Sequence, residues 1–393
     1  MTSAAKAGGS MTILLYGPPF GQAISGAYGG GTGGYARNME VYLSSLDLEN
    51  AVFEPLFHTV RGERRGLLGS FPLRMLIDGW RILARMIGRR PDAVHVLASY
   101  RTALPRELFL AMVCRILGVP LIYDIKAGAF ISAYESGGGV YRAAVEFILR
   151  NARAVLVEGR VYQVFLRKTF GIESAYFPNF VPEREVPAQV PARLTREGLT
   201  VLYAGYCYDG KGVESLLEGC ALAARSGLPV TVTLIGEETP AFKAFADAYV
   251  APPSMTVRRL GRTPHAEVLA AMQAHDIYCY PSAHSGEGHN NSINEAMMYG
   301  MVILATRHGF LPDVLSEEAA CFLASATAEE IGGRLTQIAR DRPQAARKAA
   351  AARSRLAAEF TSVQASRRLR LAYAPVLATA RLRAADHARS LAR

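Results

Sequence analysis

Short apolar runs alternate with longer amphipathic stretches along most of the chain. In the first half, such runs occupy residues 12–16, 93–97, 121–125 and 154–157. From residue 197 onward the alternation resumes, with apolar runs at residues 199–204, 230–235, 255–260, 277–280 and 302–305. Stretches with helical spacing lie between them, such as 107–117 and 140–149. Buried strands that alternate with helices are typical of parallel sheets covered on both faces, so the pattern predicts an α/β fold.

A proline-rich segment separates the two series of elements. Its prolines, at positions 178, 182, 187 and 191, stand among mixed charges, as is typical of a domain linker. The 393 residues also exceed what a single core usually holds. We therefore predict a Rossmann-like domain over residues 11–178, a linker over 179–196 and a second Rossmann-like domain over 197–360. Residues 1–10 are expected to be disordered, and residues 361–393 to form helices that pack back on the N-terminal domain.

Residues 71–90 combine helical apolar spacing with five arginines. A basic amphipathic helix of this kind can lie on an anionic membrane surface. The alternative is a helix that faces the core and solvates its arginines. We favour the second interpretation, because Trp80 serves equally well as a core residue.

A glycine-dense loop, residues 26–35, follows the first apolar run and precedes a helical stretch. Glycines let backbone N–H groups approach a phosphate, and a helix N-terminus favours negative charge. The loop, with Gly33 and Gly34 near its end, is therefore a candidate anion site. Its spacing matches neither a P-loop nor a dinucleotide fingerprint, and a mobile surface loop is the alternative.

The segment 285–300 lies between two predicted strands and places one carboxylate, Glu287, in a loop and a second, Glu295, on the following helix. Open α/β sheets bind ligands at the carboxyl ends of their strands, so both carboxylates can face one ligand there. Lys211 precedes a helix start in a similar loop, a favourable place for a cation that meets a phosphate. Asp124 and Lys126 follow a strand of the first half.

The net charge and the cysteines indicate which class of partner the protein binds and in which cellular compartment it folds. The net charge of +10 and the pI of about 9.4 favour an anionic partner, whether nucleotide phosphates, lipid headgroups or nucleic acid. Five scattered cysteines indicate a reducing compartment. No apolar run reaches the roughly 20 residues that span a bilayer, and the N-terminus has no signal-peptide pattern, so we expect a cytoplasmic protein.

A series of short motifs follows in order within residues 178–323: Tyr203-Ala204-Gly205, Lys211-Gly212-Val213, Leu234-Ile235-Gly236, Gly261, Leu269, Pro281-Ser282, Glu287-Gly288, Glu295-Ala296-Met297 and Gly300. Through these motifs, this part of the chain resembles the retaining glycosyltransferases of family 4, the glycosyl transferases group 1. It implies the GT-B architecture, in which two Rossmann-like domains face each other across a cleft. The N-terminal domain would be the acceptor side and the C-terminal domain the donor side.

The resemblance also implies a role for each matched residue. Lys211 would bind the donor diphosphate and Glu295 the ribose hydroxyls, while Glu287 would lie beside the donor sugar near the reacting carbon. Glu287 and Lys211 would be the catalytic residues. The donor site would further include Gly205, Gly288, Arg262 and the backbone amides of Asn290, Asn291 and Ser292. The Gly33–Gly34 loop would close on the diphosphate, and Lys126 with Asp124 are candidates for the acceptor side.

The function implied is transfer of a sugar, with retention of configuration, from a UDP- or GDP-linked donor to a glycan, glycolipid or polysaccharide. No cofactor, metal or nucleic acid is expected, and the protein would work at the inner face of the membrane or in the cytoplasm. The chain departs from the family at Tyr206, where an arginine is usual; Arg262 and Arg160 are candidates to replace it. Alternatives are a GT-B epimerase or phosphorylase, or a non-catalytic, membrane-associated protein that binds nucleotide sugars.

Overall fold

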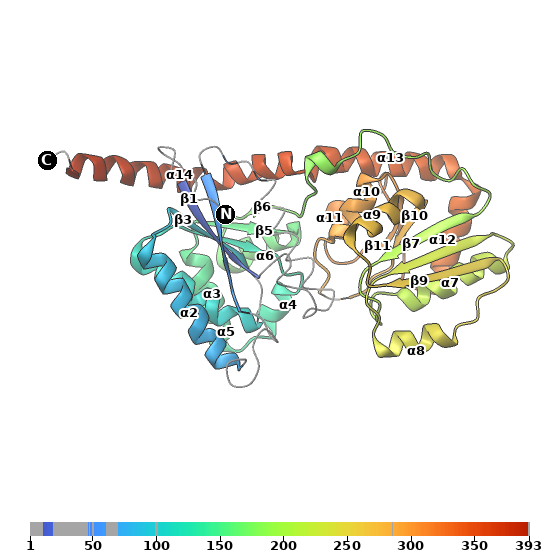
Figure 1. The fold of residues 1–393 in the computed structure, drawn as a ribbon, viewed down its shortest axis with the longest axis horizontal. Coiled ribbons are helices and arrows are strands. Elements are labelled where there is room, and N and C mark those ends of the chain that lie inside the picture. The colour runs from blue at the N-terminus through green and yellow to red at the C-terminus, as the bar shows by residue number, and fades with distance from the viewer. Residues whose placement is uncertain are drawn as a thin grey trace. The chain divides into compact units, whose positions relative to one another are not determined.

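The chain forms two compact units in a computed structural model (Figure 1). The structure describes residues 11–18, 46, 48, 51–59, 70–98, 101–284 and 286–391, with the backbone alone for 377–391. The first unit holds the described residues up to Pro178 and those from Val363 onward, and the second spans Asn179–Ser362. The expected disordered N-terminus and the Gly33–Gly34 loop lie outside the described residues.

The first unit is built on a six-stranded parallel sheet in the order β2-β1-β3-β4-β5-β6. Its strands are β1 (Met11–Gly17), β2 (Ala51–Phe57), β3 (Ala93–Ala98), β4 (Leu121–Ile125), β5 (Ala154–Val157) and β6 (Ala175–Tyr176). The four apolar runs predicted from the sequence are strands β1, β3, β4 and β5. The half-exposed edge strand β2 was not predicted, because Glu54 and Pro55 interrupt its apolar pattern. Proline is tolerated there because the strand lies at the edge of the sheet.

Helices connect these strands. They are α2 (Phe71–Gly88), α3 (Leu104–Leu117), α4 (Phe130–Glu135), α5 (Gly139–Asn151) and α6 (Arg160–Phe170), with a short 3-10 turn η3 (Arg101–Ala103). The long C-terminal helix α14 (Ser362–Leu391) buries Leu369, Tyr373 and Val376. Helix α2 buries Asp78, Ile82 and Met86 and so faces the core, as preferred from the sequence, but Trp80 is 72% exposed and its interpretation as a core residue is wrong.

The second unit repeats the architecture, with a parallel sheet in the order β12-β11-β10-β7-β8-β9. Its strands are β7 (Leu199–Ala204), β8 (Val230–Ile235), β9 (Met255–Gly261), β10 (Ile277–Tyr280), β11 (Val302–Thr306) and β12 (Cys321–Leu323). All five apolar runs predicted here are strands, and β12 is a short addition. Numbered from β7, this is the 3-2-1-4-5-6 order of a dinucleotide-binding sheet. The predicted α/β class with two Rossmann-like sheets is confirmed.

The helices of the second unit lie on both faces of its sheet. They are α7 (Val213–Arg225), α8 (Pro240–Ala248), α9 (His265–Ala274), α10 (Asn291–Met298), α11 (Leu311–Val314), α12 (Ala328–Arg340) and α13 (Arg342–Glu359), with a 3-10 turn η4 (Glu183–Glu185) in the predicted linker. Figure 1 shows α7 and α8 on one face and α9 and α10 on the other. In none of the described helices is an apolar stretch long enough to cross a bilayer.

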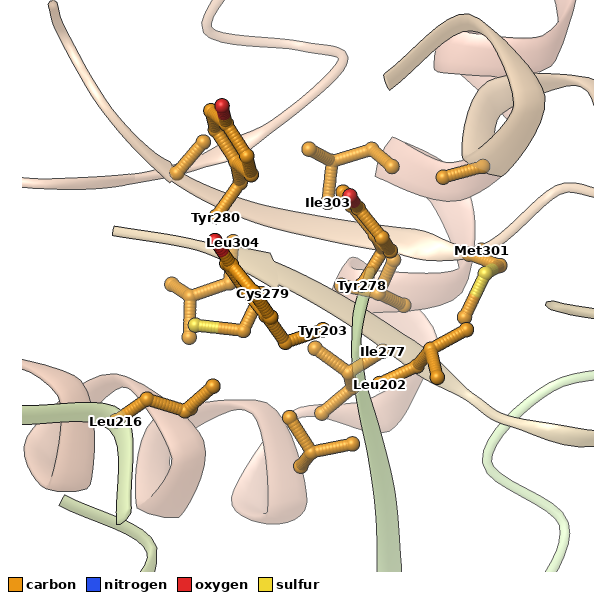
Figure 2. Packing of buried hydrophobic residues seen from close by; sticks show 14 of the residues in the cluster. Leu202, Tyr203, Leu216, Ile277, Tyr278, Cys279, Tyr280, Met301, Ile303 and Leu304 are labelled. Carbon is orange, nitrogen blue, oxygen red and sulfur yellow. The ribbon is translucent and has the colours of Figure 1, made fainter. Parts of the chain in front are cut away.

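Three tyrosines stack in the core of the second unit (Figure 2). The ring of Tyr280 lies 6.1 Å from that of Tyr203 and 6.3 Å from that of Tyr278, at interplanar angles of 8° and 10°. All three side chains are fully buried among aliphatic neighbours of β7, β10 and β11. The stack fixes the direction of the Tyr280 hydroxyl, which leaves the core at the carboxyl end of β10.

The strand order positions the candidate site. Strands β8 and β9 extend the sheet from β7 in one direction, and β10, β11 and β12 extend it in the other. The order therefore reverses between β7 and β10, and open α/β sheets bind ligands at such a switch point. The loops that follow these two strands hold Lys211 and Glu287.

Candidate functional site

Two loops meet at the carboxyl ends of β7 and β10. The Ala283 amide donates to the Gly210 carbonyl at 2.9 Å and so joins them. Gly212 has φ +68°, and a Cβ atom there would lie 2.4 Å from the Pro281 carbonyl oxygen. Only glycine therefore lets the first loop approach the second this closely before α7 begins.

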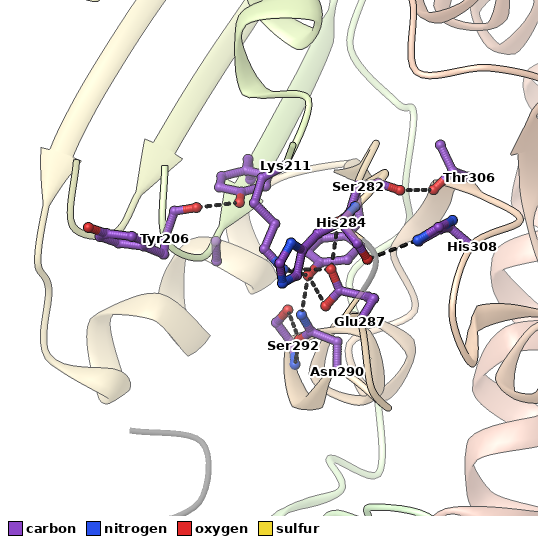
Figure 3. Close-up of polar contacts among 12 residues, drawn as sticks. Tyr206, Lys211, Ser282, His284, Glu287, Asn290, Ser292, Thr306 and His308 are labelled. Atoms are coloured by element: carbon purple, nitrogen blue, oxygen red, sulfur yellow. Dashed lines mark hydrogen bonds and ion pairs between the residues drawn. The ribbon is translucent and has the colours of Figure 1, made fainter. Parts of the chain in front are cut away.

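Glu287 is the centre of a buried hydrogen-bond network (Figure 3). Lys211 Nζ and Ser282 Oγ each donate to its Oε2 at 2.5 Å, and the Tyr280 hydroxyl donates to its Oε1 at 2.7 Å. Lys211 Nζ also donates to the Tyr280 hydroxyl at 3.0 Å. Glu287 is 6% exposed, so a charged carboxylate is stable here only because these donors compensate for its burial.

The network sets the protonation of its members. Burial would raise the pKa of the Glu287 carboxyl, but the Lys211 charge and the hydrogen bonds from Lys211, Ser282 and Tyr280 outweigh it, and the pKa is lowered. Burial, followed by the charge of Glu287, raises the pKa of Tyr280 well above its ordinary value. The result is a carboxylate held ionised and a phenol held protonated, which keeps the phenol as a donor.

The loop of Glu287 is also supported from behind by the end of β11. Gly309 has φ +57°, and a Cβ atom there would lie 2.5 Å from the Glu287 carbonyl oxygen and 2.8 Å from the Glu287 Cβ. Thr306 Oγ1 donates to the Ser282 carbonyl, and His308 Nε2 lies 2.9 Å from the His284 carbonyl oxygen. These contacts hold the loop of Glu287 in place against the carboxyl end of β11.

Asn290 connects the network to the start of α10. Its Oδ1 caps the helix by accepting from the Ser292 amide at 2.8 Å, and its Nδ2 donates to the Tyr280 hydroxyl at 2.6 Å. The Ser292 amide, expected to face the leaving phosphate, thus has an internal partner. The N-terminus of α10 points into the same region as Lys211 and favours negative charge there.

Glu295 lies on α10 and is 4% exposed. His265 Nε2, at the first residue of α9, lies 3.2 Å from Glu295 Oε1. His265 is not predicted from the sequence, because the two residues are 30 positions apart and no local pattern joins them. Tyr280 was missed for a different reason, since a tyrosine in an apolar strand is indistinguishable from a core residue.

The segment that enters the second unit is bonded to the same loop. Asn179 Nδ2 donates to the His289 carbonyl at 2.7 Å, and Asn294 Nδ2 donates to the Asn179 carbonyl at 3.1 Å. His289 Nε2 lies 2.9 Å from Asn294 Oδ1, and its ring meets Phe360 edge-on. These three residues form what we call the entry staple, Asn179–His289–Asn294.

Other predicted donor-site residues surround the loops. Gly205 donates its amide to the Ile235 carbonyl at 2.9 Å, and Gly288 is half-buried beside Glu287. Arg262 is exposed directly after β9. Tyr206, which replaces the usual arginine, packs against Tyr208 with ring centroids 5.4 Å apart. In the part of the chain that the structure describes, no hydrogen bond or ion pair joins Arg262 to the Glu287 network.

The candidate acceptor residues lie in the first unit. Lys126 Nζ donates to the Phe177 carbonyl at 2.7 Å and lies 3.5 Å from Asp124 Oδ1. Asp124 Oδ2 in turn lies 3.3 Å from His95 Nε2, whose Nδ1 is 2.8 Å from the Tyr373 hydroxyl of α14. All four side chains are buried, so this cluster joins α14 to the sheet. Arg160, the other candidate to replace the missing arginine, stacks on Tyr176 in the same unit.

Comparisons with known proteins identify a family whose model matches most of the second unit. Residues 190–355 match the family model for glycosyl transferases group 1, a range that includes Lys211, Glu287 and Glu295. No curated protein sequence matches the chain.

Solved structures match at low identity and high coverage. Anabaena HepE, in complex with UDP-glucose, aligns with a TM-score of 0.63 at 15% identity, over 91% of this chain and 97% of that one. Sucrose-phosphate synthase from Thermosynechococcus elongatus aligns with a TM-score of 0.68 at 18% identity, over 94% and 100%. A glycosyltransferase from Rickettsia africae aligns with a TM-score of 0.62 at 13% identity, over 93% and 99%. The predicted GT-B fold is confirmed.

Proposed function

We propose that this glycosyltransferase of GT-B fold moves a sugar from a UDP- or GDP-linked donor to a glycan, glycolipid or polysaccharide acceptor, with retention of configuration, as in family 4. The observation that carries the proposal is the meeting of Lys211 and Glu287 at the switch point of the second sheet, with Glu295 one helix turn beyond the loop. Anabaena HepE was solved with UDP and with UDP-glucose, which supports a UDP-linked donor.

Lys211 and the start of α10 would stabilise the leaving group. Transfer breaks the bond between the sugar carbon and the diphosphate oxygen, which keeps the electron pair. The acceptor hydroxyl then bonds to that carbon and releases its proton. Negative charge therefore grows on the diphosphate, and a fixed cation with oriented amides stabilises it without reorganisation. In this proposal no metal is required, and activity should survive a chelator.

Glu287 and Glu295 would contact different parts of the donor. Glu295 would accept hydrogen bonds from the two ribose hydroxyls. His265 Nε2, 3.2 Å from Glu295 Oε1, would orient the carboxylate for this contact. Glu287 would lie beside the sugar, where positive character develops as the bond breaks. Its three internal donors keep it ionised for that role.

A reducing, cytoplasmic location is part of the proposal. Each of the five cysteines is a free thiol, and four of them are buried. Thiols of this kind are typical of proteins that fold in a reducing compartment. Contact with the membrane would bring the enzyme to a lipid-linked acceptor.

Nucleotide binding tests the assignment. Titration calorimetry with UDP and GDP should show that Lys211→Ala and Glu295→Ala each lower the affinity for the preferred nucleotide at least about tenfold, since each variant loses a charged hydrogen bond. Lys243→Ala and Glu267→Ala, at exposed positions of the same unit, are the matched controls. Affinity that is unchanged in both site variants would refute the proposal.

Turnover distinguishes the rival activities. Nucleoside diphosphate released only in the presence of an acceptor, with a product of unchanged anomeric configuration by NMR, is the expected result. Interconversion of free nucleotide sugars would identify an epimerase. A requirement for orthophosphate or a sugar phosphate would identify a phosphorylase.

A further inference from the structure

Three half-buried aromatic side chains stand beside the pair of Lys211 and Glu287. Tyr206 and Tyr208 lie in the loop after β7, and His284 lies in the loop after β10. The ring centroid of Tyr208 is 5.4 Å from that of Tyr206 and 5.7 Å from that of His284, which it meets edge-on. Lys211 Nζ lies 6.0 Å from the Tyr208 centroid. We call these three residues the aromatic row, Tyr206–Tyr208–His284.

The backbone of the aromatic row is fixed at both ends. The Tyr203 hydroxyl donates to the Tyr206 carbonyl at 3.0 Å, and the Tyr206 side chain points away from Glu287 (Figure 3). The His284 amide donates to Ser282 Oγ at 3.3 Å, and the His284 carbonyl is bonded to the end of β11. The rings are therefore held in place through their main chain.

The polar atoms of these side chains have no protein partner. Among the residues that the structure describes, nothing hydrogen-bonds to the hydroxyls of Tyr206 and Tyr208 or to the ring nitrogens of His284, which take part only through their main chain. By contrast, the Tyr280 hydroxyl a short distance away has three partners. The aromatic row thus presents unused hydrogen-bonding groups next to a fully bonded network.

Both central groups of the row are uncharged at neutral pH. Burial, followed by the charge of Glu287, raises the pKa of the Tyr208 phenol. Burial, followed by the charge of Lys211, lowers the pKa of the His284 imidazole. A neutral imidazole has one donor and one acceptor nitrogen, and a phenol can donate and accept. Groups of this kind pair well with hydroxyls and add no charge to attract a further phosphate.

We propose that the aromatic row binds a sugar ring, either the sugar of the donor or a sugar of the acceptor. The inference rests on the proposed function, which brings both sugars to Glu287. A sugar has a face of C–H groups, which packs on aromatic carbon, and a rim of hydroxyls, which pairs with the phenol and the imidazole. Binding sites commonly combine aromatic walls with a few polar groups in this way.

The donor arm of the test compares ligands with and without the sugar. Titration calorimetry of the full chain uses UDP-glucose with UDP, and GDP-mannose with GDP. If the row binds the donor sugar, Tyr208→Leu should lower the affinity for the nucleotide sugar about tenfold and change the affinity for the nucleoside diphosphate less than about twofold. The nucleoside diphosphate also reports any indirect effect through Lys211, which lies close to the same ring.

The acceptor arm uses methyl glycosides of the common hexoses, with the nucleoside diphosphate present. Saturation-transfer NMR measures their binding without turnover. If the row binds the acceptor, Tyr208→Leu should lower the affinity for the glycosides about tenfold. Tyr208→Phe and His284→Phe keep a ring and lose only hydrogen-bonding atoms, so each should lower the affinity about threefold in the same arm.

Tyr249→Leu is the matched control. Tyr249 is a half-buried tyrosine that follows α8, and its ring packs on Phe245 with centroids 5.7 Å apart. The chain there leads to the amino end of β9, away from the loops of the site. This variant should bind every ligand as the wild type does.

Two results would overturn the proposal. The first is Tyr208→Leu that binds nucleotide sugars and glycosides as the wild type does. The second is an equal loss for UDP-glucose and UDP, or for GDP-mannose and GDP, which would assign the row to the nucleotide, because bases also stack on aromatic rings. Failure of the proposed function has a different signature, since the wild type would then bind neither nucleotide, while the glycoside measurement would still decide on the row.

Discussion

Replacing Glu287 with glutamine should strengthen the binding of nucleoside diphosphate while abolishing sugar transfer. Lys211 Nζ lies 2.5 Å from Glu287 Oε2, so the cation that would bind the diphosphate already has an anionic partner. Glutamine keeps the shape of the side chain, but its single oxygen can accept from only one of Tyr280 and Ser282, because these two groups donate to different oxygens of Glu287. It also removes the negative charge that competes with the diphosphate for Lys211.

The size of the effect follows from the distance. A phosphate oxygen bound to the Lys211 ammonium lies about 5 Å from the Glu287 carboxylate, where two like charges repel by about 3 kcal/mol at an effective dielectric constant near 20. Solvent in an open site reduces this by about half, which leaves roughly 1.4 kcal/mol, or about a tenfold gain in affinity. Transfer should fall at least about a hundredfold, as is usual when a preorganised charge is lost.

The assay pairs titration calorimetry of the free nucleoside diphosphate with turnover of the donor sugar. The free diphosphate has no sugar for Glu287 to contact, so it isolates the competition for Lys211. Glu267→Gln, an exposed carboxylate on α9, is the control for general loss of charge. Weaker binding of the diphosphate by Glu287→Gln would refute the reasoning, because Glu287 would then be orienting Lys211 rather than competing for it.

Two further predictions concern the same network. Tyr280→Phe removes a hydroxyl bonded to Lys211, Glu287 and Asn290 and should lower the free energy of unfolding by about 1 to 3 kcal/mol in a denaturant titration, while Tyr249→Phe, which removes a half-buried hydroxyl, should cost less. An equal loss in both would contradict the central role of Tyr280. Because the pKa of Glu287 is lowered from 4.5 in the folded state, its stabilisation is complete above that pH and is lost as the pH falls through the lower folded-state value. Wild type should therefore lose more stability than Glu287→Gln between about pH 5 and pH 3, and parallel losses would show that another group titrates.

The sequence predicts the central strands well because each is a continuous apolar run that must be buried on both faces. It misses β2, which is interrupted by Glu54 and Pro55, and β6 and β12, which are only two and three residues long. Strands at the edge of a sheet need less apolar surface and leave a weaker pattern.

The sequence predicts the charged residues of the site more fully than the residues that hydrogen-bond to them. Lys211 and Glu287 follow strands that turn out to be neighbours, so their meeting follows from the sheet order. The partners Tyr280 and His265 depend on how rings stack and helices pack, which no local spacing encodes. Helix α2 is apolar on two sides, and periodicity alone does not tell which of them faces the core.

The entry staple has a mechanical consequence. The chain crosses into the second unit after Pro178, and the next residue, Asn179, is bonded through its side chain to the His289 carbonyl, two positions from Glu287. The backbone at this crossing is therefore tied by a side-chain hydrogen bond to the loop that holds the carboxylate. The first residue of the second unit and the loop of Glu287 thus share one set of hydrogen bonds, so a substitution at Asn179 should disturb the carboxylate with no helix between the two.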